Sequence, residues 1–238
     1  AVSWSYLNAG ARAESNYAAI TPGMPAARAS GNTLVLLSHI RNSAASFTGY
    51  GAWQEIGTVS ASAHLWVHAI TDDGSMSAPT LTPTGGSSGH TCLAQIFAFG
   101  GGLADVSNII AHGPATSVNS TVDQTVETPA LTITIGDTLV LCAFANNDDN
   151  TSVDNPTGTN PWVAAQYVNS ALGADSSIGL KYIVQTTATS IGADTFTVSG
   201  AAAAVSGALV VALKPAAVIG GGLLMPHMWD ELDTYVRM

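Results

Sequence analysis

Short apolar runs alternate with polar clusters along most of the chain. Val, Ile, Thr, Leu and aromatic residues gather in runs of about 5 to 9 residues, bounded by Gly, Asn, Asp and Pro. No helical period lies between these runs, so the pattern predicts antiparallel sheets stacked as sandwiches. The predicted strands are 33–40, 51–56, 63–71, 79–83 and 91–99, followed by 130–135, 138–145, 162–168, 178–185, 194–198 and 206–213.

The order of these features occurs twice. GNTLVLL at 31–37 matches GDTLVLC at 136–142, and LWVHAIT at 65–71 aligns with LKYIVQT at 180–186. The longer second spacing requires an insertion in the second copy, and the polar segment 146–156 is the place for it. A fixed order of features at nearly constant spacing is typical of a duplication. We therefore expect an all-β protein with two tandem antiparallel β-sandwich repeats, jelly-roll or Ig-like, at 1–102 and 103–215.

The repeated apolar positions are the expected core. Each sandwich should be built around those of its own copy, because inward-facing residues of a sandwich are the apolar ones. The residues are Leu34, Leu36, Trp53 and Leu65 in the first copy and Leu139, Leu141, Trp162 and Leu180 in the second. The cysteines, Cys92 and Cys142, fall within predicted strands and outside any metal-binding spacing, so we expect two buried thiols, with a disulfide as the alternative.

The last part of the chain, 216–238, differs from both copies. A run of three glycines is followed by apolar residues at helical spacing, which predicts a short amphipathic helix on a tether. These residues are Met225, Met228, Trp229, Leu232 and Val236. Such a helix cannot bury its apolar face alone. It should dock either on its own sandwich or on a neighbouring chain, and we expect an arm that packs against another subunit.

Composition narrows the function classes. Only 9% of residues are charged, against about 25% in a typical soluble domain, and the net charge is −10. The six Lys and Arg residues are scattered, whereas nucleic-acid binding needs clustered cations. No apolar run is long enough for a membrane helix. A surface this poor in charge predicts either small polar side chains or contacts with neighbouring subunits.

GGSSGH at 85–90 satisfies the G-x-S-x-G pattern of a nucleophile elbow, with His90 next to it. That motif works only where a strand turns into a helix. Here a predicted strand follows, so we interpret the segment as a hairpin loop. We expect no catalytic residues and a protein that is not an enzyme.

HLWVH at 64–68 places two histidines four residues apart. Along a strand that spacing spans about 13 Å, so both rings cannot ligate one metal ion. The alternation instead puts His64, Trp66 and His68 on one face. We expect this face to be a partner interface or a half-covered sheet.

The polar loop 147–150, with Asp154, offers the oxygen ligands that calcium takes. It lacks the spacing of a calcium-binding loop, so a solvated insertion is expected. We therefore assign neither a metal nor a cofactor.

The second copy repeats the pattern of the first copy more distinctly. It consists of GDTLVLC at 136–142, Trp162, the middle strand 180–184, TFT at 195–197 and the closing strand 208–214. It resembles the tandem β-sandwich modules in virion proteins of tailed bacteriophages, such as capsid decoration, head-fibre and tail-associated subunits. The resemblance covers about residues 20 to 214 and carries over no catalytic residues. It implies a non-enzymatic virion protein, assembled in the host cytoplasm, whose partners are other capsid or tail subunits and further copies of itself.

The alternative is a secreted carbohydrate-binding or adhesin module. Exposed Trp53 or Trp66 would then stack on sugar rings, including those of a host-surface glycan. The N-terminal residues have no basic and apolar leader segment. Whether Ala1 follows removal of Met or cleavage of a signal peptide stays open.

Overall fold

The computed structural model describes residues 4–60, 63–101, 109–149, 152–153, 160–200 and 202–215, and every regular element in them is a β-strand. We call the described residues up to 101 the first half and those from 109 onward the second half. Each half contributes one large sheet and one small sheet, and all pairings are antiparallel. The all-β expectation is therefore confirmed.

The first half forms a six-stranded sheet. Its order is β1 (Ser5–Ala9), β8 (Thr91–Gly100), β3 (Thr33–Ile40), β6 (His64–Thr71) and β5 (Gln54–Val59), with β2 (Ala13–Asn16) also paired to β8. A two-stranded sheet of β4 (Ser46–Thr48) and β7 (Thr82–Thr84) lies beside it.

The second half forms a five-stranded sheet and a three-stranded sheet. The larger has the order β13 (Val163–Ser170), β14 (Ser176–Gln185), β11 (Thr138–Asn146), β16 (Ala204–Leu213) and β9 (Ile110–Asp123). The smaller has the order β10 (Thr125–Thr128), β15 (Asp194–Ser199) and β12 (Ser152–Val153).

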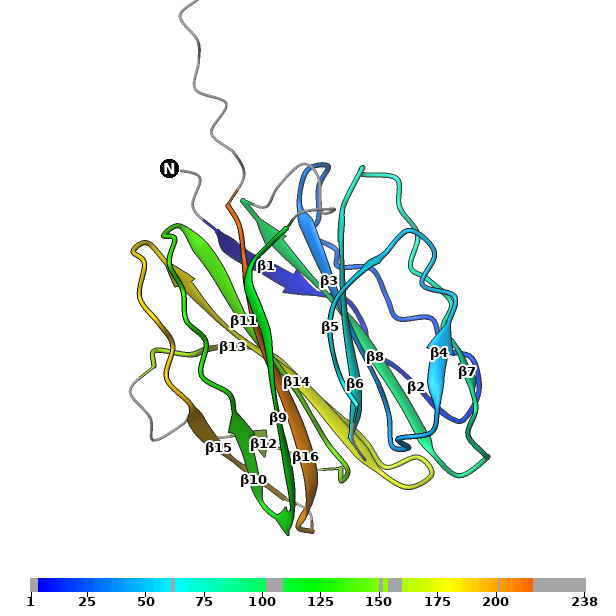
Figure 1. Cartoon of the computed structure of the whole chain (residues 1–238). Coiled ribbons are helices and arrows are strands. Elements are labelled where there is room, and N and C mark those ends of the chain that lie inside the picture. The colour runs from blue at the N-terminus through cyan, green and yellow to red at the C-terminus, as the bar shows by residue number, and fades with distance from the viewer. Residues whose placement is uncertain are drawn as a thin grey trace, which may run out of the picture.

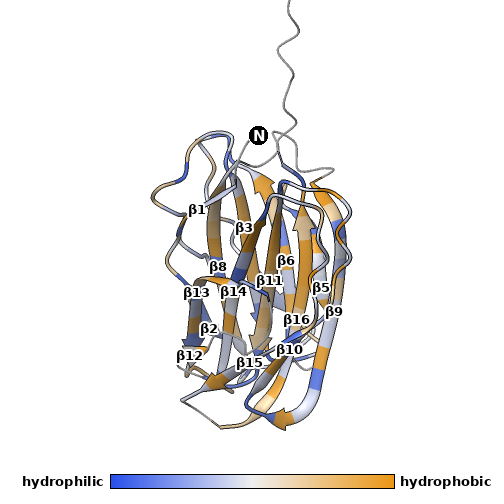
Figure 2. Ribbon diagram, turned by 90° about the vertical axis from the view of Figure 1, so that its left-hand side faces the viewer, coloured by the Kyte–Doolittle hydropathy of each residue, from blue (hydrophilic) through white to orange (hydrophobic). Residues whose placement is uncertain are grey.

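The sheets stack in layers, with the two large sheets in the middle and the small sheets outside (Figure 1). Apolar side chains fill the spaces on both sides of each large sheet. Figure 2 colours much of the central strands as hydrophobic. The central strands β3, β8, β11 and β16 are therefore buried on both faces, and their sequences are nearly continuous apolar runs.

All eight repeated apolar residues are buried, as expected. Their distribution between cores differs from the expectation, however. Leu34, Leu36 and Trp53 pack in the outer core of the first half, and Trp162 packs in that of the second. The four others lie in a core shared by the two large sheets: Leu65, Leu139, Leu141 and Leu180. The halves thus meet through a common apolar layer.

This distribution corrects the register of the sequence repeat. Val35 and Leu37 face the shared core, as Leu139 and Leu141 do, whereas Leu34 faces outward. Aligning GNTLVLL with GDTLVLC therefore joins residues from opposite faces, because a shift of one position reverses every side chain of a strand. The two large sheets do share one strand order, with β3 between β6 and β8 and β11 between β14 and β16. The tandem duplication itself stays a prediction.

The observed strands differ from the predicted ones in three ways. The expected strand 130–135 is wrong, because only an isolated bridge between Leu131 and Ile191 forms there, and β10 lies earlier. The expected strand 51–56 begins later, as β5. The strands β1, β2, β4, β9 and β12 were not expected, and most are short, whereas β9 is long but rich in Ser, Thr and Gly.

Candidate functional site

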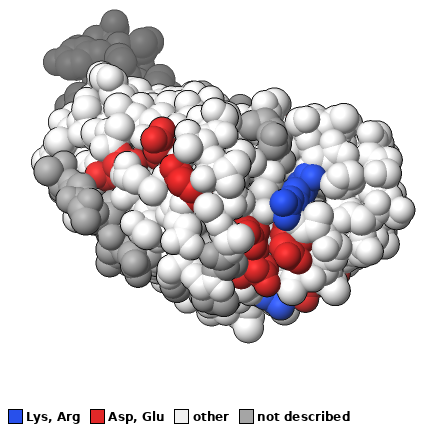
Figure 3. Space-filling view, turned by 90° about the horizontal axis from the view of Figure 1, so that it is seen from below, with Lys and Arg blue, Asp and Glu red and all other residues white. Residues whose placement is uncertain are grey.

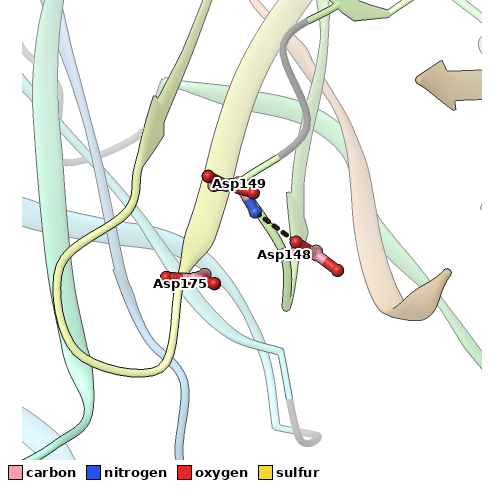
Figure 4. A group of neighbouring side chains, drawn as sticks. All are labelled: Asp148, Asp149 and Asp175. Atoms are coloured by element: carbon pink, nitrogen blue, oxygen red, sulfur yellow. Dashed lines mark hydrogen bonds between the residues drawn. The ribbon is translucent and has the colours of Figure 1, made fainter. Parts of the chain in front are cut away.

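The candidate site lies at the lower end of the seam between the halves, where acidic and basic side chains gather (Figure 3). Asp148 and Asp149 follow β11, and Asp175 lies in the connection between β13 and β14. Their carboxylate oxygens come within 4.8 Å of one another. Figure 4 shows the two adjacent aspartates, with the N–H of Asp149 donating to the Asp148 carboxylate at 2.8 Å.

Side chains of the first half hold this cluster in place. Arg41, just after β3, donates from Nη1 to the carbonyl oxygen of Asp175 at 3.2 Å. Arg12 donates to the carbonyl oxygen of Asn169 in β13 and is paired with Glu14 at 3.2 Å. These guanidinium groups join the two halves across the seam.

The second half adds its own support. The Asn169 side chain donates to the carbonyl oxygen of Asp149 at 2.9 Å. The neighbouring hairpin turns through Gly173 and Asp175, both with positive φ. The hydroxyl of Thr91, at the start of β8, donates to the carbonyl oxygen of Leu172 in that hairpin. Hydrogen bonds from neighbouring side chains therefore hold Asp149 and the hairpin that carries Asp175.

Opposing effects act on the pKa of Asp148 in this cluster. Partial burial raises the pKa of Asp148, and the negative charge of Asp149 acts in the same direction. Arg41 opposes both effects. Burial also raises the pKa of the nearby Tyr167 hydroxyl, and the charges of the same two aspartates add to this increase.

Chemically, three carboxylates offer hard oxygen ligands of the kind that calcium takes. The guanidinium of Arg41 already supplies positive charge there. The sequence expectation combined the loop at 147–150 with Asp154, and Asn150 and Asp154 lie outside the described residues. Asp175 was missed because it lies far along the chain, and no spacing motif connects it to the loop. We assign no metal to the cluster.

The predicted partner face of β6 is buried by the chain itself. His64, Trp66 and His68 have exposed fractions of 9%, 7% and 4%. The Trp66 ring stacks near His64, with ring centroids 3.7 Å apart, and Tyr50 stacks on His68 at the same distance. A partner would therefore reach these side chains only if the covering segment that carries Tyr50 moved away.

Burial also sets the protonation state of these rings. It lowers the pKa of His68 to about 4 and lowers that of His64 as well. The His64 ring contacts Trp66 of β6, and the His68 ring contacts Tyr50 of the covering segment. They are neutral core residues near pH 7.

GGSSGH at 85–90 connects β7 to β8, so it is a strand-to-strand loop, as expected. His90 Nδ1 lies 3.0 Å from the Ser87 carbonyl oxygen and 3.5 Å from its hydroxyl. The same nitrogen also lies 3.4 Å from the Asn42 amide. A ring nitrogen shared in this way is not placed to activate the Ser87 hydroxyl.

The remaining expectations concern the thiols and the tail. Cys92 and Cys142 are buried free thiols, which confirms that expectation. The predicted arm, with Met225, Met228, Trp229, Leu232 and Val236, lies outside the described residues and stays a prediction. In the described part of the chain, no helix has the length and hydropathy needed to cross a membrane.

Comparisons with protein-family models, with curated proteins and with solved structures yield no match to this chain.

Proposed function

We propose that this chain is a non-enzymatic structural subunit of a larger particle, of the kind found in tailed-bacteriophage virions. In this role it binds neighbouring capsid or tail subunits and further copies of itself. The observation that carries the proposal is how the few charges of the molecule are used. A subunit that is covered by neighbours needs few surface charges, whereas a free soluble domain usually carries many.

Four of the six basic side chains serve internal contacts in the described part of the chain. Lys181 is only 2% exposed, with its ammonium 4.4 Å from the centre of the Phe196 ring. Arg28 forms an ion pair with the buried Asp72 at 2.6 Å. Arg12 and Arg41 bridge the two halves. These cations support the fold rather than a positively charged binding surface, and this fits a protein that recognises neutral protein surfaces.

The layered sheets support the same role. The shared core joins the halves through β3, β8, β11 and β16, whose ladders are continuous over most of their length. Such a body is stiff, because close-packed interiors transmit strain instead of yielding to it. A stiff block suits a repeated structural position.

The carbohydrate-binding alternative relied on exposed tryptophan rings. Trp53 and Trp66 are 6% and 7% exposed, and Trp4 and Trp162 are buried as well. Stacking on a sugar needs an open ring face, which these four residues do not present. The structural role is therefore the better-supported function.

The proposal is tested on particles from the organism that encodes the chain. Particles lacking the chain would be purified on a density gradient and mixed with the purified full-length protein. We expect the protein to move to the particle band and to saturate at a fixed ratio. Protein that stays at the top of the gradient, or binds without saturation, would contradict the proposal.

A further inference from the structure

The long strand β9 (Ile110–Asp123) forms one edge of the five-stranded sheet. It pairs with β16 on one side, and no other described strand pairs with it on the other side. In Figure 2 it lies on the right-hand flank of the molecule, on the same side as β5. An edge strand presents unpaired backbone N–H and C=O groups, which another strand can join.

The outer edge of β9 lacks the charged side chains that commonly prevent such pairing. From Ile110 to Val122 it contains no Asp, Glu, Lys or Arg. Val118 and Val122 are 47% and 67% exposed on this strand. Natural edge strands are commonly protected by charged side chains, especially lysine. A neutral edge with exposed valines is open to pairing with a further strand.

The other edges of the large sheets are interrupted or occupied. The β1 and β2 edge is split, and Arg12 and Glu14 lie at its second segment. The β5 edge is short and carries Glu55. On β13, the guanidinium of Arg12 already donates to the carbonyl oxygen of Asn169. Among these edges, β9 is the one that is neutral from Ile110 to Val122 and that carries no contact from an arginine side chain.

The irregularities of β9 limit pairing to one short stretch. Register shifts occur on both sides of the five consecutive pairs that join 115–119 to β16. Pro114 has no N–H to donate, and the Asn119 side chain bonds to the Thr121 N–H and the Thr125 hydroxyl. A partner strand can therefore add regularly only at 115–119, and the centre of that stretch is Ser117.

We propose that β9 joins β9 of a second copy of this chain, antiparallel and about a two-fold axis at Ser117. The pairing would make one continuous sheet from the two five-stranded sheets. Thr116 of one copy then lies opposite Val118 of the other, a β-branched cross-strand pair of the kind favoured in sheets. This inference rests on the proposed function, because it names the surface used for self-association.

A second copy fits this edge because a two-fold axis places the regular stretch 115–119 opposite itself and keeps the irregular positions of both strands outside the pairing. Each chain carries a net charge of −10, so two copies repel each other, and a neutral edge adds no close contact between like charges to that repulsion. The edge from Ile110 to Val122 is neutral and complementary to itself, because backbone donors and acceptors alternate along an antiparallel pair. Salt should therefore strengthen the dimer by screening the remaining repulsion.

The first experiment measures self-association of the full-length protein by sedimentation velocity at increasing concentration. We expect a monomer–dimer equilibrium that shifts toward the dimer as salt is added. Val118→Lys should weaken the dimer about tenfold or more, because a charged side chain would lie at the new strand pair. Val163→Lys is the matched control: Val163 is 49% exposed on β13, the opposite edge of the same sheet. It should leave the dimer unchanged.

A second experiment tests the register directly. Ser117→Cys places two thiols opposite each other at the two-fold axis, at about 4.5–5.5 Å between Cβ atoms, within reach of a disulfide after small adjustment. Oxidation should give a covalent dimer, whereas Ala164→Cys on β13 should not. Cys92 and Cys142 are buried and do not interfere.

Three results would overturn the inference: a wild-type protein that stays monomeric up to about 1 mM, equal effects of the two lysine substitutions, or equal cross-linking of the two cysteine variants. Failure here is distinct from failure of the proposed function. A monomeric protein that still saturates particles refutes only the β9 dimer. A β9 dimer that never joins particles refutes only the structural role.

Discussion

The contact between Gly57 and Leu209 offers a quantitative test of how the halves pack. Gly57 lies in β5 of the first half, and Leu209 lies in β16 of the second. A Cβ atom added at Gly57 would lie 2.2 Å from Leu209 Cδ1 and 3.0 Å from Pro114 Cβ. Leu209 is fully buried in the shared core, so its side chain has no open space to move into.

Gly57→Ala should therefore destabilise the protein by about 1–3 kcal/mol, the usual effect of an extra methyl in a packed core. Leu209→Ala alone should cost about 2–5 kcal/mol, because it leaves a cavity. In the double variant the new methyl group occupies part of that cavity. Its destabilisation should then be smaller than the sum of the single effects, by about 0.5–3 kcal/mol.

The assay is urea unfolding followed by tryptophan fluorescence and circular dichroism on the four proteins of this cycle. Gly192→Ala is the control, since the nearest heavy atom to its added Cβ is Asn160 Nδ2 at 3.9 Å. It should change stability by no more than about 0.5 kcal/mol. Strictly additive effects of the Gly57 and Leu209 substitutions would refute the packing of the two large sheets against each other.

Three further predictions concern single groups. Arg28→Met should destabilise the protein by about 3–5 kcal/mol in urea unfolding, because it leaves the fully buried Asp72 carboxylate without its cation. Burial lowers the pKa of His39 and His68 to about 4. The unfolded chain therefore takes up protons that the folded chain does not. The unfolding free energy should fall as the pH drops from about 6.5 toward 4, and His68→Phe should flatten this dependence. Both cysteine thiols should resist a thiol-reactive dye in the folded protein and react after unfolding, since both are fully buried.

The sequence was most informative where a strand is buried on both faces. The strand expected at 33–40 is β3 with the same bounds, and those expected at 91–99 and 138–145 are each one residue short. Continuous apolar runs between turn residues have few alternative interpretations. The edge strand β9 was missed because its sequence, IAHGPATSVNSTVD, contains no apolar run and is half exposed.

Two other features depend on how the chain packs. The repeat alignment matched residues by letter, but faces are set by pairing with neighbouring strands, so Leu34 and Leu139 point to different cores. The acidic cluster joins Asp148 to Asp175 through two separate loops. Neither the facing of these leucines nor the grouping of these aspartates can be recognised from residues that are close in sequence. The burial of Trp66 and His68 depends likewise on the covering residues Phe47 and Tyr50, which strand alternation on β6 cannot reveal.

Hydrogen exchange, compared between dilute monomer and the self-associated protein, tests the proposed assembly through the β9 sheet edge. We predict that amides in 115–119 of β9 become protected on association, while those of β13 and of the loops around Asp148 and Asp175 keep their rates. Unchanged exchange in 115–119, or protection that arises at the acidic cluster instead, would contradict the proposal.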